Sequence, residues 1–218
     1  MRHLRTLVLV AGLFAIHGQA AAQQAPLELW GGLDVFTASL TPDASEEQGT
    51  ADRMWGGQLS FGATSMRVLS VGADLGFVGL RDHRSFTEPT TGGDKTSTVG
   101  GVMGSLRAGL STPPLSLAAD GATDLRIGMN VGYTLIGADR SINECVDCTI
   151  ESVRIHAGGF WEPGLQLFRG KHGLSARYRR YTGDSDVRDA VMIGYTLRAG
   201  PRAPRPVPVP VPVPVPQP

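Results

Sequence analysis

The strongest constraint on this chain is the period of its apolar residues, which repeats every two positions over long segments. Between Leu125 and Leu135, apolar side chains alternate with polar residues and glycines. Successive side chains of a β-strand point to opposite faces, whereas a helix would scatter both sets around its circumference. The segment therefore predicts a strand with one apolar face and one polar face.

The same alternation recurs along the chain in eight segments. A strand of about ten residues, tilted at about 45°, crosses a bilayer, whereas strands of soluble β-sandwiches are nearer five or six residues. An even number of such strands predicts an all-β fold, an eight-stranded antiparallel up-and-down transmembrane β-barrel. The segments are 27–36, 55–63, 69–77, 101–110, 125–135, 152–162, 174–179 and 191–198.

The connections between these segments differ in length in the way that a transmembrane barrel requires. Such a barrel has short periplasmic turns and longer outer loops. With a periplasmic N-terminus, the inner connections lie near Thr64–Met66, Ser111–Thr123 and Arg169–Lys171. Ser111–Thr123 departs from the rule because it is longer than the fourth outer connection. The outer connections lie near Ala38–Arg53, Arg81–Thr96, Gly137–Thr149 and Thr182–Arg188.

Charged residues collect on the polar faces of the predicted strands. On a lipid-facing surface each charge would cost about 2–4 kcal/mol at the midplane, so we expect the polar faces to point into the lumen. Eight strands leave just enough room for side chains, and opposite charges there can pair and plug the lumen. The expected lumen charge network is Glu28, Asp34, Asp74, Arg107, Arg126, Arg154, Glu162, Arg177, Arg179 and Arg198.

Glycines and aromatic residues occupy characteristic places in the predicted strands. Glycine inside a strand predicts a β-bulge or tight curvature, and this applies to Gly31, Gly32, Gly56, Gly57, Gly100, Gly101, Gly158 and Gly159. Aromatic residues near strand ends predict interfacial girdles, and these are Trp55, Phe61, Phe77, Trp161 and Tyr195.

The two ends of the chain have compositions of their own. Arg2 and Arg5, the apolar run 7–16 and Ala20–Ala22 predict a secretory signal peptide that is cleaved near Ala22. The run is too short for a membrane-spanning helix. After the last strand, alternating Val and Pro favour a polyproline II tail. We therefore expect a signal peptide over 1–22, a barrel over 23–200 and a Pro-rich periplasmic tail over 201–218.

Together these features resemble the OmpA-like outer-membrane β-barrel family, which also carries a Pro-rich segment after its last strand. In that family the segment leads to a peptidoglycan-binding domain, which we expect to be absent here. The last strand, AVMIGYTL, resembles an assembly signal, with Leu197 and Arg198 where the final Phe would stand. The resemblance implies location in the outer membrane. It also implies contact with membrane lipid and lipopolysaccharide, and with the barrel-insertion machinery during assembly, and it leaves a periplasmic partner of the tail open.

The two cysteines, Cys145 and Cys148, lie in the predicted third outer loop. A CxxC pair can be a redox site, half of a zinc site or a local disulfide. A redox pair needs a helix N-terminus in a βαβ unit, and structural zinc needs four ligands. Export favours oxidation, so we predict a Cys145–Cys148 disulfide.

Several other function classes find little support in the sequence. Without Arg2 and Arg5, 18 Lys and Arg stand against 20 acids, and no basic stripe suggests nucleic-acid binding. We expect no metal, no cofactor and no catalytic residues. The nearest match to a lipid A acyl hydrolase, His172 with Ser175, has the wrong spacing and lies near a periplasmic turn.

We therefore expect an envelope structural or surface-interaction role. Two alternatives stay open: a lipid A-modifying barrel enzyme, and a secreted lipocalin-like binder of a small ligand, whose barrel would be apolar inside. The sequence identifies no specific ligand, solute conductance or oligomeric state.

Overall fold

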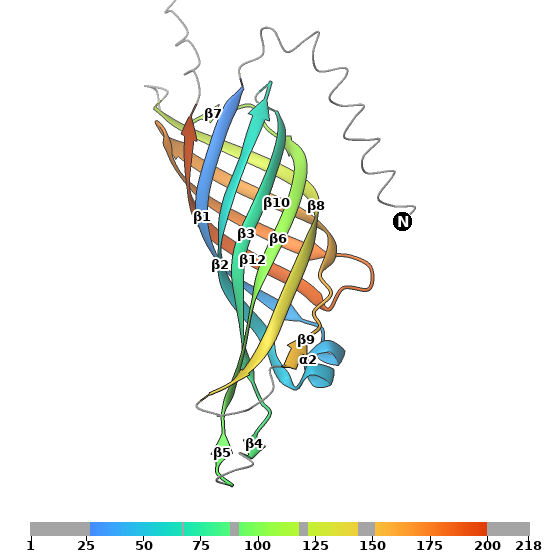
Figure 1. Ribbon diagram of the computed structural model, residues 1–218. Helices are drawn as coiled ribbons and strands as arrows, with labels where there is room; N and C mark the ends of the chain where they lie inside the picture. Colours follow the sequence, from blue (N-terminus) through green and yellow to red (C-terminus); the bar gives the residue numbers. More distant parts are fainter. Residues whose placement is uncertain (1–26, 67, 88–91, 118–121, 144–150, 200–218) are drawn as a thin grey trace, which may run out of the picture.

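The computed structural model describes residues 27–66, 68–87, 92–117, 122–143 and 151–199. Eight long strands form a closed antiparallel barrel in the order β10-β11-β12-β1-β2-β3-β6-β8, and pairing of β8 with β10 closes the ring (Figure 1). The predicted eight-stranded up-and-down barrel is thus confirmed. The strands are β1 Glu28–Leu40, β2 Thr50–Ser65, β3 Leu69–Asp82, β6 Ser97–Ser111, β8 Thr123–Ile142, β10 Gly158–Arg169, β11 His172–Tyr181 and β12 Val187–Ala199.

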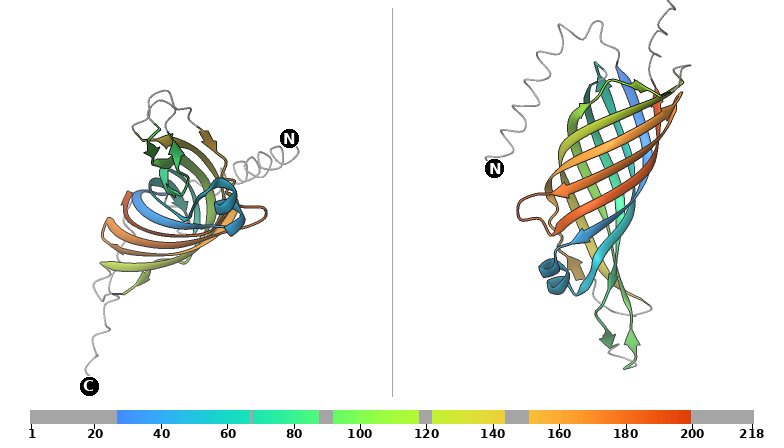
Figure 2. Two further views of the ribbon diagram at one scale, coloured as in Figure 1. Left: turned by 90° about the horizontal axis from the view of Figure 1, so that it is seen from below. Right: turned by 180° about the vertical axis from the view of Figure 1, so that it is seen from behind.

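The strands are strongly tilted. Following the paired residues once around the ring from Glu28 of β1 leads back to β1 at Ala38, a stagger of ten residues. A stagger of this size in a small barrel corresponds to a tilt of about 35–45°. Seen from behind, β8, β10, β11 and β12 accordingly cross the barrel obliquely (Figure 2).

The two ends of the barrel differ in their connections. One end, called the loop end, carries helix α2 (Pro42–Gln48), the short strands β4 (Phe86–Thr87) and β5 (Asp94–Lys95), and β9 (Glu151–Val153) (Figure 1). The other end, called the turn end, joins β2 to β3 and β10 to β11 within a few residues. The termini of β1 and β12 that lead to the chain ends also lie there.

The long connection after Ser111 is a continuation of the β6–β8 hairpin. Pro113 and Pro114 interrupt β6, because proline cannot donate a ladder hydrogen bond. Strand β7 (Leu115–Ser116) then resumes the pairing with β8. The backbone N–H of Leu117 donates to the carbonyl of Thr123, so the two segments are still hydrogen-bonded at this point. The predicted inner connection Ser111–Thr123, which is longer than expected, is therefore an extension of the β6–β8 hairpin.

The segment predicted as the sixth strand is divided in two. β9 ends at Val153, residues 154–157 are irregular, and β10 starts at Gly158 with φ 77°. Val153 and Ala157 are buried, but beyond Gly158 the even-numbered Phe160 and Glu162 are the buried residues. The left-handed glycine therefore switches the face of the strand. Arg154, which was expected in the lumen, is exposed and lies outside the strands, so that prediction is wrong.

The glycine pairs at 31–32, 56–57 and 100–101 do not form the predicted bulges. Pairing is continuous through residues 31–32, 56–57 and 100–101, and the register shifts lie at Ser39/Leu40 and Thr50/Met54. Several glycines instead leave room for rings inside the barrel. A Cβ on Gly56 would lie 2.5 Å from the ring of Phe36. Close approach of side chains accounts for such glycines.

Candidate functional site

The outer wall of the barrel carries a belt of exposed apolar side chains. On β3 the belt runs from Leu69 to Phe77, about 27 Å along the strand. With the tilt, its height approaches the band of about 25 Å that surrounds barrels in membranes. The belt includes Leu33, Val35, Leu59, Phe61, Val71, Leu75, Val102, Leu106, Leu110, Ile127, Met129, Val131, Leu135, Leu165, Leu174, Val191, Ile193 and Leu197.

Aromatic pairs lie on the loop side of this belt. Trp55 and Phe77 meet edge to face, with ring centroids 6.5 Å apart. Trp161 and Tyr178 form a similar pair at 6.1 Å. Rings with an apolar body and a polar edge favour the boundary between hydrocarbon and water.

Beyond the aromatic pairs, the two faces of the strands exchange their polarity. On β3, Leu75 and Phe77 point outward while Asp74 is buried; further along, Arg81 points outward while Val78 and Leu80 are buried. The same change occurs on β2, where Trp55 gives way to Arg53 outside and Gln58 to Met54 inside. The barrel is thus apolar outside along the belt, but polar outside and apolar inside at the loop end.

At the level of the belt the lumen holds a central charge cluster, made of Asp34, Asp74, Glu162, Arg107, Arg177 and Arg179. These side chains are at most 6% exposed. Arg177 Nη2 lies 2.6 Å from Asp34 Oδ2, and Arg177 Nη1 lies 3.2 Å from Glu162 Oε1. Arg179 reaches Asp74 at 3.0 Å and Glu162 at 2.7 Å, and Arg107 reaches the same two acids. Three carboxylates thus balance three guanidinium groups.

Neutral side chains complete the central charge cluster. Ser60 and Ser175 donate hydrogen bonds to Asp34, and Asn130 donates to Glu162 at 3.3 Å. The predicted lumen network contained only charged residues and therefore omitted these three, although each lies on the inward face of its strand. Because the cluster lies away from water, removing one charged partner leaves another buried and uncompensated, at a cost of about 3–5 kcal/mol.

A second group of charges, the inner-end cluster, lies at the turn end. Arg126 makes two hydrogen bonds to Glu28, at 2.8 and 3.0 Å. Arg198 makes two to Asp124, at 3.2 and 2.6 Å. Asp124 had not been predicted as a lumen residue, because the alternation was followed only from Leu125 onward.

Three inward rings lie between an arginine and the barrel wall. Arg107 lies 4.8 Å above the ring of Trp30, and the wall behind that ring contains Gly62 and Gly72. Arg179 similarly lies 3.8 Å from the ring of Phe160. The third ring is Phe168, approached by Arg126 and Arg198 at 5.4 and 4.4 Å. Cation–π contact holds these arginines in addition to their ion pairs.

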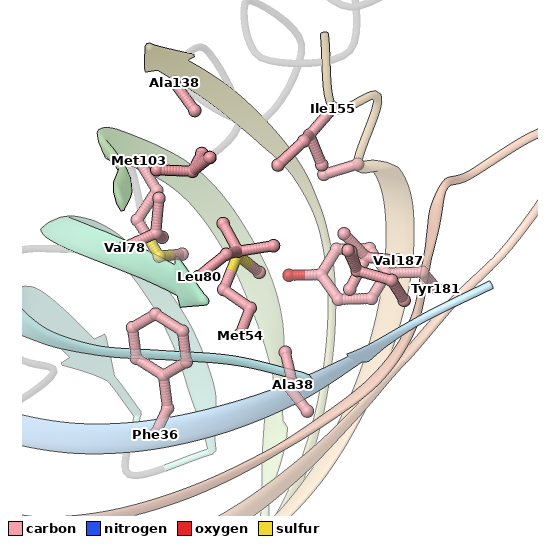
Figure 3. Packing of buried hydrophobic residues seen from close by; sticks show 14 of the residues in the cluster. Phe36, Ala38, Met54, Val78, Leu80, Met103, Ala138, Ile155, Tyr181 and Val187 are labelled. Atoms are coloured by element: carbon pink, nitrogen blue, oxygen red, sulfur yellow. The ribbon is translucent and has the colours of Figure 1, made fainter. Parts of the chain in front are cut away.

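Between the central charge cluster and the loop end, the lumen is filled by an apolar layer (Figure 3). The side chains converge from opposite walls, for example Met54 and Leu80 from one side and Tyr181 and Val187 from the other. This layer was not predicted, because most of its residues lie outside the segments predicted as strands. Its members include Phe36, Ala38, Leu40, Met54, Val78, Leu80, Met103, Ala138, Ile155, Tyr181 and Val187.

Above the apolar layer, an outer polar cluster of Asp82, Arg84, Arg140 and Glu151 joins the loops. Arg140 contacts both Asp82 and Glu151 at 2.5 Å. Arg140 and Arg84 also donate to the carbonyls of Gln48 and Glu47 at the end of α2. Helix α2 is thereby attached to the barrel.

The carboxyl group of Asp82 lies beyond the apolar belt. Burial by itself raises its pKa. Hydrogen bonds from Ser97, the backbone N–H of Arg84 and the guanidinium of Arg140, together with the charge of Arg140, outweigh burial and lower the pKa of Asp82 below its ordinary value. Asp82 is therefore a stable anion in the folded loop end.

The residues weighed as catalytic candidates do not form a set. Ser175 is buried in the lumen against Asp34, whereas His172 is exposed and contacts the Tyr195 hydroxyl. Asp186 accepts a hydrogen bond from the backbone of His156, which fastens two loops together. The described residues include no group of three or more His, Cys, Asp or Glu that could hold a metal ion. Cys145 and Cys148 lie outside the described residues.

Among the parts of the chain that the structure describes, no helix is both long and apolar enough to cross a membrane.

No protein-family model matches the sequence. A comparison with curated proteins likewise gives no match. Among solved structures, the chain is similar to Ail, the attachment invasion locus protein of Yersinia pestis, in complex with the heparin analogue sucrose octasulfate. The identity is 15%, the coverage is 81% of this chain and 100% of that chain, and the TM-score is 0.45.

Two other solved structures show comparable similarity. Neisserial surface protein A has 11% identity, coverage of 79% of this chain and 95% of that chain, and a TM-score of 0.40. The outer membrane protein OprG from Pseudomonas aeruginosa has 12% identity, coverage of 80% and 96%, and a TM-score of 0.35. All three TM-scores are below 0.5, so the barrel assignment rests on the strand pairings of the chain itself.

Proposed function

We propose that this protein resides in the bacterial outer membrane, with the loop end facing outward, and has an envelope structural or surface-interaction role. The exchange of polarity at the aromatic pairs is the observation that carries this proposal. An apolar outer wall is stable in lipid, and an apolar interior under a polar wall is stable in water. This barrel has an apolar outer wall along the belt and a polar outer wall at the loop end, which fits a chain that leaves the bilayer at Trp55 and Phe77.

The filled lumen supports a structural or binding role over conduction. The inner-end cluster, the central charge cluster and the apolar layer follow one another along the axis of the barrel. An ion crossing this path would have to separate buried ion pairs and then enter apolar surroundings, and both steps are costly. We expect conductance to be small or absent.

The attachment of α2 supports a role for the outer surface. Arg84 and Arg140 fix the end of α2, and Asp186 fixes the loops around His156. Loops held in one conformation bind a partner with less loss of entropy than mobile loops do. We further propose contact with outer-membrane lipid and lipopolysaccharide, contact with the insertion machinery during assembly, and a periplasmic partner for the tail.

The two alternatives are less well supported by the side chains. For a lipid A acyl hydrolase, His172 and Ser175 would have to share a site, but one is exposed and the other lies in the lumen. For a lipocalin-like binder, apolar residues would line the full height of the barrel, but Met129 and Val131 are 48% and 60% exposed on its outer wall.

Cell fractionation tests the proposal, together with gel mobility before and after boiling. We expect the protein in the outer-membrane fraction and a mobility that changes on heating, because a stable barrel stays folded in detergent until boiled. Protein found free in the periplasm or medium would overturn the proposal. As a functional control, alanine variants of His172 and Ser175 should leave the acylation pattern of lipid A unchanged, and a changed pattern would favour the hydrolase.

A further inference from the structure

We propose that the outer wall of β2, β3, β6 and β8 binds lipid A, with a phosphate on Arg53 and Arg81 and an acyl chain in the hollow over Gly104. The inference rests on the proposed function, because it requires the loop end to lie in the outer leaflet. It names the ligand, the residues and the depth of one site on the wall of the barrel.

The first observation is a pair of arginines without acidic partners. Arg53 and Arg81 follow the last regular pair between β2 and β3, Met54 and Leu80, on the side of the loops. Both are exposed, and no ion pair joins either of them to another described residue. Like charges on neighbouring strands repel, and an anion bound to both arginines would relieve that repulsion. Guanidinium groups hold phosphate oxygens through two parallel hydrogen bonds.

The position of the pair restricts the anion to the level of lipid headgroups. Trp55 and Phe77, the aromatic pair at the upper boundary of the belt, lie on the same two strands. Arg53 follows Trp55 outward by two residues, and Arg81 follows Phe77 by four. Both arginines thus lie just above the boundary, where the phosphates of an outer-leaflet lipid lie.

The second observation is a hollow in the apolar belt beneath Arg81. It measures about 420 Å³, and its rim includes Leu75, Val102 and Leu135. Gly104 pairs with Leu75 on one side and with Leu135 on the other, and its missing side chain opens the hollow. Gly137 widens it toward the loop end. The hollow is apolar and open to the outside, which suits an acyl chain.

The two observations fit the two ends of one ligand. Arg81 of β3 pairs with Thr98 of β6, and Phe77 of β3 pairs with Val102 of β6. Val102 borders the hollow, and the Arg81 pair lies two rows of outward residues farther toward the loop end. The distance is about 13 Å along the strand. A lipid with a phosphate at the arginines can therefore lay one acyl chain in the hollow. Lipid A, which combines phosphates with several acyl chains, is the outer-leaflet lipid of this chemistry.

Titration of the full-length protein in detergent micelles tests the site. The probes are lipid A, dephosphorylated lipid A and phosphatidylglycerol, and bound lipid is counted by native mass spectrometry. Each arginine near a charged membrane surface contributes about 1 kcal/mol, so R53A/R81A should bind lipid A about 25-fold more weakly. Gly104→Leu should also weaken binding by filling the hollow. A Cβ there meets only Leu75, at 3.7 Å, so the barrel itself should tolerate this change.

Arg188→Ala is the matched control. Arg188 is also an exposed arginine of the loop end, but Asp189 neutralises it at 3.1 Å, so its removal should change binding less than twofold. Equal binding of wild-type protein and R53A/R81A, or of lipid A and its dephosphorylated form, would overturn the site. Equally tight binding of phosphatidylglycerol would overturn the choice of lipid A. In all these cases wild-type protein would still fractionate with the outer membrane, whereas failure of the proposed function would remove it from that fraction.

Discussion

Replacing Glu162 by Gln tests whether the central charge cluster stabilises the barrel. The Glu162 side chain has no exposed surface and contacts Arg107, Arg177 and Arg179. Glutamine keeps the shape but removes the charge, which leaves three guanidinium groups facing two carboxylates. Breaking a buried ion pair of this kind costs about 3–5 kcal/mol. Each hydrogen bond to a charged group is worth about 1.5–3 kcal/mol, but the three arginines share one acid, so their contributions do not add.

The assay is urea unfolding in lipid vesicles, which yields the free energy of unfolding from the loss of the heat-modifiable band. We expect Glu162→Gln to lower this free energy by about 3–5 kcal/mol. Asp189→Asn is the control, because Asp189 pairs with Arg180 and Arg188, whose side chains are 43% and 52% exposed. Its effect should stay below about 1 kcal/mol.

A double variant separates loss of charge balance from loss of packing. Adding Arg107→Gln to Glu162→Gln restores equal numbers of positive and negative groups in the cluster. The double variant should therefore be more stable than the sum of the single effects predicts, by about 0.5–3 kcal/mol. If Glu162→Gln costs no more than Asp189→Asn, or if the two changes simply add, the argument from charge pairing is refuted.

Three further predictions concern other parts of the barrel. Because the pKa of Asp82 is lowered in the folded state, its carboxylate stabilises the loop end fully above the ordinary carboxyl pKa, and this stabilisation is lost as the pH falls through the lowered value. Proteolysis near α2 should therefore accelerate in acid, and the Asp82→Asn variant should be cleaved equally fast at neutral pH. In the same urea assay, Gly62→Ala should destabilise the barrel by about 1–3 kcal/mol, because the added Cβ would lie 2.3 Å from the ring of Trp30. Gly137→Ala is its control: no atom lies within 4 Å of the added Cβ, so the stability should change by less than about 0.5 kcal/mol. A Cys145–Cys148 disulfide would lower the mass of the unreduced protein by two hydrogens (about 2 Da), and complete thiol labelling of native protein would exclude it.

The strand count and the faces within the belt could be predicted because they depend on one simple rule. Where lipid lies outside and charge inside, apolar and polar side chains alternate strictly along a strand. An error of one residue in following this alternation would assign every side chain of the strand to the wrong face. The charged residues Asp34, Asp74 and Arg179 lie on the faces expected of them. Arg154 does not, because the left-handed backbone at Gly158 restarts the alternation, and a glycine in sequence does not reveal its φ angle.

The apolar layer was missed for a different physical reason. Above the belt the solvent outside is water, so the rule inverts and the apolar residues face inward. Val78 and Leu80 continue the alternation of β3, and Arg81 marks the outward face, but the predicted strand ends at Phe77 and the predicted connection begins at Arg81. Along these segments the apolar residues still recur every second position, but they move from the outward to the inward face of the strand. This signal in the sequence could have extended the predicted strands. Contacts across the barrel, such as Arg179 of β11 with Asp74 of β3, depend on the stagger of the ring and could not be derived from any single strand.

The central claim is that the belt faces lipid while the opposite face of each strand fills the lumen, and the three tryptophans test it most directly. Trp55 and Trp161 are exposed on the belt, whereas Trp30 lies inside beneath Arg107. Three variants, each keeping one tryptophan and carrying Phe at the other two positions, are reconstituted in vesicles of brominated lipid, which quenches fluorescence on contact. We predict strong quenching of Trp55 and Trp161 and little quenching of Trp30. Quenching of Trp30 with protection of Trp55 and Trp161, or no quenching of any of the three, would contradict the account.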